Sequence, residues 1–223
     1  MKFTSVIATG ILLALFAIAC GSTPMQSQVL RTHVGVKDNR PPKPVINRNP
    51  HPTAYEVNVA IKDAPGPFEV VDAAMQYQVL DPSCRPDLGG MAGTRAALVE
   101  WVPVKLLPAS NGGYRGVIYE DFLKDDDYYG LGVCHWTMVA VQFRLKATSK
   151  PSDAEFSYHL HRDHISDGAS LKAYFWKGMY PRSPVDGMTV PGNETPDKFK
   201  TEVRNQLFYL QMDLKKEAYS HLH

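Results

Sequence analysis

The stretch CHWTMVAVQFRL, residues 134–145, decides the fold of this 223-residue chain. Two sets of apolar side chains alternate along it with the period of a β-strand. One set is Cys134, Trp136, Met138 and Ala140, and the other is Val139, Val141, Phe143 and Leu145. A strand that is apolar on both faces is typical of the covered centre of a sheet. The sequence therefore predicts a central strand with two buried faces here.

Further short strands are predicted on both sides of this one. Alternating or β-branched residues mark the ranges 55–61, 75–79, 98–107, 114–119, 156–160 and 171–176. The C-terminal part is predicted to hold a short helix near 196–205, opened by Thr195-Pro196-Asp197, and then a strand near 207–215. Short strands with little helix favour a mainly β fold, an antiparallel β-sandwich-like single domain with a short C-terminal helix.

The first twenty residues carry the marks of an export signal. Lys2 gives a basic start, Val6 to Ala19 form an apolar run, and Ala17-Ile18-Ala19 places small residues before Cys20. The apolar run is too short to cross a bilayer comfortably as a helix. The segment resembles bacterial lipoprotein signals, whose lipobox ends in a small residue followed by cysteine. The resemblance implies cleavage before Cys20 and a lipid on its thiol; a plain secreted protein with an ordinary Cys20 thiol is the alternative.

This interpretation divides the chain into three parts. They are a signal peptide at 1–19, a lipidated cysteine with a proline-rich tether at 20–53, and a β-rich periplasmic domain at 54–223. Pro41-Pro42-Lys43-Pro44 and Asn49-Pro50-His51-Pro52 favour extended backbone, which suits a spacer, although part of it is also compatible with an edge strand on the domain.

Charge and the residue after the cysteine bear on location and partners. The chain holds 24 basic and 23 acidic side chains, and loss of Lys2 with the signal leaves it formally neutral. A neutral chain gives no electrostatic reason to expect nucleic acid as a partner. The membrane contact is expected from the lipid alone. Position 21 is Gly rather than the Asp that signals inner-membrane retention, so the resemblance implies an outer-membrane anchor facing the periplasm.

The remaining cysteines form an even pair. With Cys20 assigned to the lipid, Cys84 and Cys134 are left in an exported chain, which favours one disulfide over two buried free thiols. Cys84 lies in a proline-rich turn and Cys134 opens the central strand, so the bond would fasten a loop to the core.

A histidine-rich string is the most specific candidate for a metal-binding or catalytic motif. HLHRDH, residues 159–164, resembles the metal-binding motif of the metallo-β-lactamase superfamily, in which imidazoles and a carboxylate hold a zinc ion that activates water. Here the string lies late in the chain on an alternating strand, with His159 and His161 on the face opposite Phe156, Tyr158 and Leu160. We therefore expect no cofactor and no enzyme, and keep His159, His161 and His164 as weak metal-binding candidates.

Acidic and aromatic residues gather just before the central strand. The candidates for partner binding are Glu120, Asp121, Asp125, Asp126, Asp127, Tyr128 and Tyr129. Their spacing does not match a calcium-binding EF-hand loop. They are compatible with a solvated turn and with a negative patch for a basic protein surface.

The stretch DYYGLGVCHW, residues 127–136, together with the Cys84 turn, looks like part of the small lipoproteins that accompany antibacterial secretion-system toxins. Those proteins are immunity proteins, which sit in the periplasm and cap a cognate toxin. The resemblance implies a protein-binding module that neutralises a toxin by occlusion, with contacts in residues 120–129. An envelope scaffold or assembly lipoprotein is the main alternative, and a zinc-dependent hydrolase is a minor one.

Overall fold

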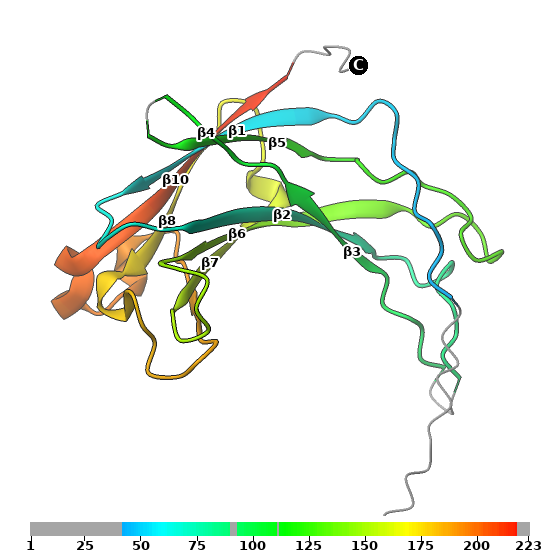
Figure 1. Ribbon diagram of the computed structural model, residues 1–223. Coiled ribbons are helices and arrows are strands. Elements are labelled where there is room, and N and C mark those ends of the chain that lie inside the picture. The colour runs from blue at the N-terminus through cyan, green and yellow to red at the C-terminus, as the bar shows by residue number, and fades with distance from the viewer. Residues whose placement is uncertain (1–41, 90–92, 111, 218–223) are drawn as a thin grey trace, which may run out of the picture. The chain divides into compact units, whose positions relative to one another are not determined.

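Residues 42–89, 93–110 and 112–217 are described by the structure, a computed structural model, and they form two five-stranded sheets (Figure 1). The first sheet has the order β4 (Leu107–Pro108), β5 (Tyr114–Tyr119), β1 (Ala54–Lys62), β10 (Leu207–Lys216), β8 (Ser170–Trp176). The second has the order β3 (Val99–Val104), β2 (Val70–Val79), β6 (Trp136–Lys146), β7 (Glu155–His161), β9 (Thr189–Pro191). The prediction of a mainly β, sandwich-like single domain is confirmed.

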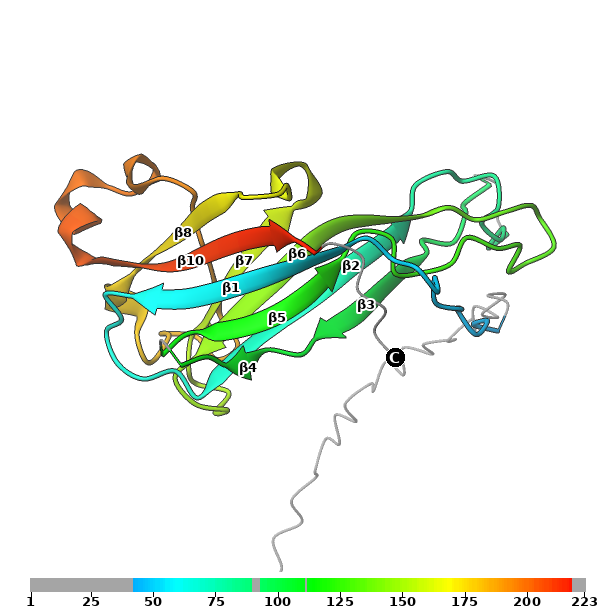
Figure 2. The ribbon, with the colours of Figure 1, turned by 90° about the horizontal axis from the view of Figure 1, so that it is seen from above.

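Pairing within the sheets is antiparallel with one exception. Figure 2 shows strands β1, β5 and β10 of the first sheet lying over β2, β6 and β7 of the second. β9 pairs with β7 in parallel, so the second sheet is mixed rather than purely antiparallel. The predicted C-terminal helix consists of two short 3-10 helices, η3 (Pro196–Lys198) and η4 (Thr201–Gln206), and β10 follows directly.

The core lies between the two sheets and is rich in aromatic rings. Phe208 of β10, Phe175 of β8 and Phe156 of β7 are at most 1% exposed. The Phe208 ring centroid lies 5.1 Å from that of Phe156 and 5.2 Å from that of Phe175, with Phe68 at 5.5 Å. These rings therefore join strands of both sheets in one cluster.

Strand β6 is central, as predicted, but only one of its faces is buried. Its pairing with β2 skips Val139: Gln76 pairs with Ala140, and Tyr77 pairs with Met138. This β-bulge changes which alternate residues face inward. The side chains that face the core are therefore Trp136 and Met138 before the bulge and Val141, Phe143 and Leu145 after it. Ala140 pairs with His161 on the opposite face of the strand. The prediction of two covered faces is wrong because the bulge turns Trp136 and Met138 of one apolar set and Val141, Phe143 and Leu145 of the other toward the same core.

The described part of the proline-rich segment packs against the domain. The Asn49 N–H donates to the Phe122 carbonyl at 2.8 Å, and the Lys124 N–H donates to the Asn47 carbonyl at 2.9 Å. Arg48 and Leu123 form an antiparallel bridge between these bonds. Residues 47–49 thus pair with loop residues 122–124 through an isolated β-bridge, outside the strands of both sheets. The signal peptide, Cys20 and residues 21–41 lie outside the described residues.

Among the described residues, no helix is long and apolar enough to cross a membrane.

Candidate partner-binding site

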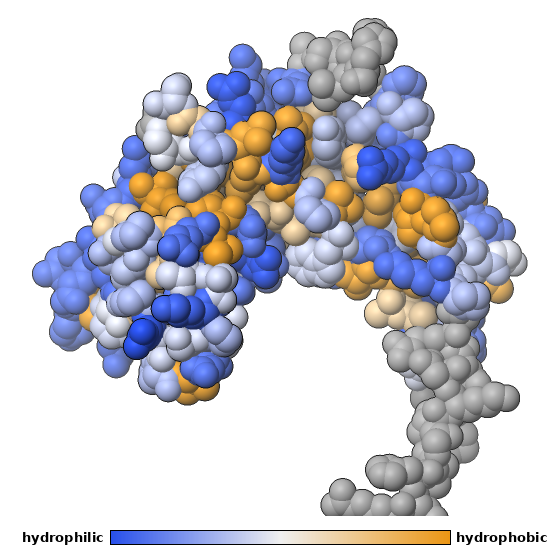
Figure 3. Space-filling model, viewed as in Figure 1, coloured by the Kyte–Doolittle hydropathy of each residue, from blue (hydrophilic) through white to orange (hydrophobic). Residues whose placement is uncertain are grey.

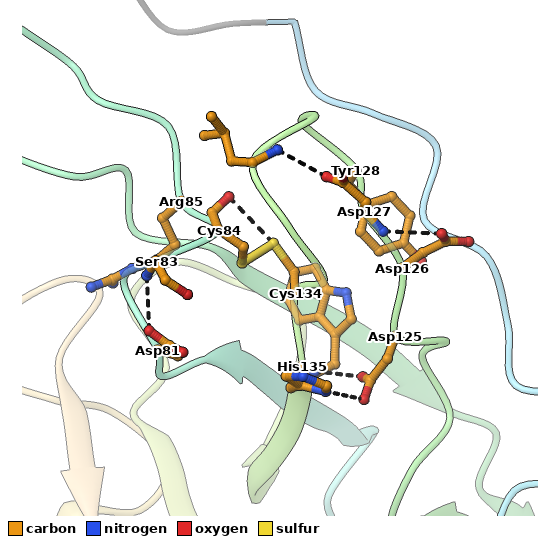
Figure 4. The surroundings of a disulfide bond; sticks show 12 residues. Asp81, Ser83, Cys84, Arg85, Asp125, Asp126, Asp127, Tyr128, Cys134 and His135 are labelled. Atoms are coloured by element: carbon orange, nitrogen blue, oxygen red, sulfur yellow. Dashed lines mark hydrogen bonds and ion pairs between the residues drawn. A yellow bond between two sulfur atoms is a disulfide. The ribbon is translucent and has the colours of Figure 1, made fainter.

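The predicted disulfide between Cys84 and Cys134 is confirmed. The two Sγ atoms are 2.05 Å apart, and the two Cα atoms are 5.3 Å apart. The last pair of the β2–β6 ladder is Val79 with Trp136, so the bond lies just beyond the end of that ladder. It joins the segment after β2 to the segment before β6 (Figure 4). We call these two segments, residues 80–89 and 120–135, the stapled loops.

Two of the predicted carboxylates hold the second stapled loop to neighbouring segments. Asp121 accepts a hydrogen bond from the Thr53 N–H at 2.6 Å and another from Asn49 Nδ2 at 3.2 Å. Asp125 accepts one from the Trp136 N–H at 2.8 Å and lies 2.7 Å from His135 Nδ1. These contacts position the loop at both of its ends.

The next two carboxylates order the tip of the same loop. Asp126 Oδ2 lies 2.9 Å from the Lys124 ammonium, whose hydrogen bond lowers the pKa of the Asp126 carboxyl. Asp127 accepts a hydrogen bond from the Leu131 N–H at 3.0 Å. The Cys134 N–H donates to the Asp126 carbonyl at 3.0 Å, so the segment between them forms a closed turn. These contacts fix the backbone at the tip of the loop.

The two tyrosines are half-buried rather than free at the surface. The Tyr128 hydroxyl donates to the Lys124 carbonyl at 2.6 Å and accepts from the Asn47 N–H at 3.3 Å. Burial raises the pKa of both tyrosines. Tyr129 lines a pocket of about 220 Å³ together with Trp136 and Pro44. Both rings therefore hold residues 42–47 against the loop.

Glu120, the remaining predicted contact residue, forms an ion pair with Arg162. Arg162 opens the 3-10 helix η1 (Arg162–His164) after β7. The seven predicted residues therefore lie on one loop, and each has a contact that orders it. Two of the carboxylates still reach the solvent: the side chains of Asp125 and Asp126 are 44% and 41% exposed.

The stapled loops also expose aliphatic side chains that the sequence analysis did not select. Leu131 and Val133 are each 49% exposed, and Leu80 in the other stapled loop is 60% exposed. Gly130 and Gly132 have φ angles of 69° and 109°, so the backbone turns on either side of Leu131. The sequence feature that could have indicated this exposure is an aliphatic residue between two loop glycines. Figure 3 shows hydrophobic residues among hydrophilic ones at this end of the domain, on the right of the view.

The three histidines of the string lie on two elements, β7 and η1. His159 and His161 are exposed on β7, and the opposite face of that strand is buried, as predicted. His164 lies on η1, with its Nδ1 3.4 Å from a Glu194 carboxylate oxygen. Among the residues that the structure describes, no group of three His, Cys, Asp or Glu side chains is placed to hold a metal ion.

Comparisons with protein-family models, with curated proteins and with solved structures give no match to this chain. The function must therefore be argued from the site itself.

Proposed function

We propose that this chain is a membrane-anchored periplasmic lipoprotein whose β domain binds a partner protein through the stapled loops. We propose further that it is an immunity protein, which neutralises a cognate secretion-system toxin. The observation that carries the proposal is a loop pair that is covalently fastened and internally hydrogen-bonded, yet leaves Leu131, Val133 and Leu80 exposed.

Order and exposure together favour binding. A loop that is already fixed loses little conformational entropy when a partner binds, so more of the contact energy appears as affinity. Exposed aliphatic side chains beside charged ones match the arrangement of an interface, with an apolar centre and a polar rim. The carboxylates around Leu131 suit a basic partner surface, which they would also attract at long range. An envelope scaffold would use the same loops and differ in its partner.

The test begins with the protein encoded by the neighbouring gene. Cells in which the neighbour-encoded protein is delivered to the periplasm should survive when the full chain described here is co-expressed. The variant Leu131→Asp should bind the neighbour-encoded protein with a dissociation constant about 30-fold higher than the native chain does. This corresponds to a loss of about 2 kcal/mol in binding free energy, as expected for a central interface residue. Affinity is measured by calorimetry and protection by colony counts.

The matched control is Val185→Asp. Val185 is also an exposed aliphatic residue, at 65%, but it lies between η2 (Lys177–Met179) and β9, outside the stapled loops. It should keep both affinity and rescue. Failure of the full chain to rescue cells or to bind the neighbouring protein would contradict the immunity proposal. Equal losses from both variants would show that the stapled loops are not the contact surface.

The anchor has its own test. A Cys20→Ser chain lacks the thiol that would carry the lipid, so it should incorporate no labelled palmitate and should leave the membrane fraction. The native chain should be labelled and should sediment with outer membranes. A Cys84→Ser chain serves as the control, because it removes a cysteine of the disulfide and leaves the lipobox unchanged. Acylation of the Cys20→Ser chain would contradict the lipoprotein assignment.

A further inference from the structure

Two imidazoles stand side by side on the solvent face of β7. His159 and His161 are both exposed, while Leu160 between them is fully buried. Residues two apart on a strand point to the same side, so the two rings project in the same direction. On the neighbouring strand β6 the residues opposite them are Gln142 and Ala140, and neither carries a charge.

Both rings open into a groove with room for a hydrated ion. The groove has a volume of about 430 Å³ and lies between β7 and the chain that follows β9. Its wall also contains Thr189, Asn193 and Thr195, whose oxygen atoms suit bound water, and the charged Glu194 and Lys198. Glu194 already has a hydrogen-bond partner, because its carboxylate accepts a hydrogen bond from the Tyr158 hydroxyl at 3.1 Å.

The two rings are available as ligands. Neither His159 nor His161 makes a side-chain hydrogen bond or an ion pair with the part of the chain that the structure describes, in contrast to His135 and His164. A ring nitrogen without a hydrogen-bond partner in the protein can bind a metal ion without first breaking a protein contact.

We propose that His159 and His161 together form a two-imidazole site for Cu(II), independent of the proposed function. The choice of metal follows from the number of donors. Structural zinc sites use four protein ligands and catalytic ones three, and among the described residues no third His, Cys, Asp or Glu side chain joins this pair. Cu(II) binds imidazole more tightly than the other divalent first-row metals and accepts a tetragonal site completed by water.

The experiment titrates Cu(II) into the mature chain, residues 20–223, purified without an affinity tag. His221-Leu222-His223 repeats the same histidine spacing at the C-terminus, so all proteins carry His221→Gln and His223→Gln. Electron paramagnetic resonance should report one Cu(II) per chain with two equatorial imidazole nitrogens. His159→Gln and His161→Gln should each raise the dissociation constant for Cu(II) at least about tenfold, because only one of the two imidazole ligands then remains.

The matched control is His164→Gln, which removes a neighbouring imidazole that lies off the strand face. It should leave the dissociation constant and the spectrum unchanged. Unaltered thermal unfolding of each variant shows that the fold is intact. The proposal is overturned if the native pair binds no stoichiometric Cu(II), if neither strand variant weakens binding, or if His164→Gln weakens it equally.

Discussion

Replacing Cys84 and Cys134 together by alanine should lower the free energy of unfolding by about 4 kcal/mol, because a disulfide restricts the conformational freedom of the unfolded chain. The bond joins cysteines 50 residues apart, so it closes a long loop and its loss releases many conformations. For a domain of this size the melting temperature should fall by about 8–16 °C. Thermal unfolding followed by circular dichroism measures the change.

The native chain provides the control for this prediction. In the presence of a reductant it should unfold at the temperature of the double variant, and the double variant should not respond to the reductant. An unchanged melting temperature of the reduced native chain would contradict the predicted contribution. The same loss should weaken partner binding, because the stapled loops would then have to be ordered during binding.

Phe208→Ala should destabilise the domain by about 3–5 kcal/mol, the usual range for removing a buried phenylalanine ring. Phe208 is fully buried, and its ring contacts those of Phe156 and Phe175 from two other strands. Loss of this ring leaves a cavity between the sheets that their backbones cannot close. Denaturant unfolding measures the loss, with an unchanged slope expected.

Phe208→Leu is the matched variant, because it keeps most of the apolar volume. Its loss should be about 1.5 kcal/mol or less. Equal losses from the alanine and leucine variants would mean that the volume of the ring is not what stabilises this cluster.

Much of the fold could be predicted because period-two alternation is a local signal. The predicted ranges 114–119, 156–160 and 171–176 correspond to β5, β7 and β8 within a residue at each end. The faces of β6 could not be predicted, because the bulge at Val139 arises only when β2 pairs with it. Strand β9 was missed, since three residues carry no periodicity and its pairing depends on distant β7.

The candidate site shows the same division between local and distant information. The sequence indicated the acidic loop and the cysteine pair, because both depend on residue type and position. It did not indicate that Asp121 and Asp125 would accept hydrogen bonds from Thr53 and Trp136. The Thr53 contact depends on the packing of residues 47–53 against the loop, and the Trp136 contact depends on the loop folding back onto the start of β6. The exposure of Leu131 likewise depends on the turn made by its glycine neighbours.

The β-bridge at residues 47–49 determines how far the stapled loops could travel from a bilayer. Asn47 is 27 residues after Cys20, and a fully extended chain of that length spans at most about 95 Å. An acylated Cys20 would therefore confine the loops to a hemisphere of roughly that radius. One molecule in such a volume corresponds to about 1 mM, a typical effective concentration for a flexible tether. A partner held at the membrane within reach of one anchored chain would therefore meet the stapled loops at about that concentration.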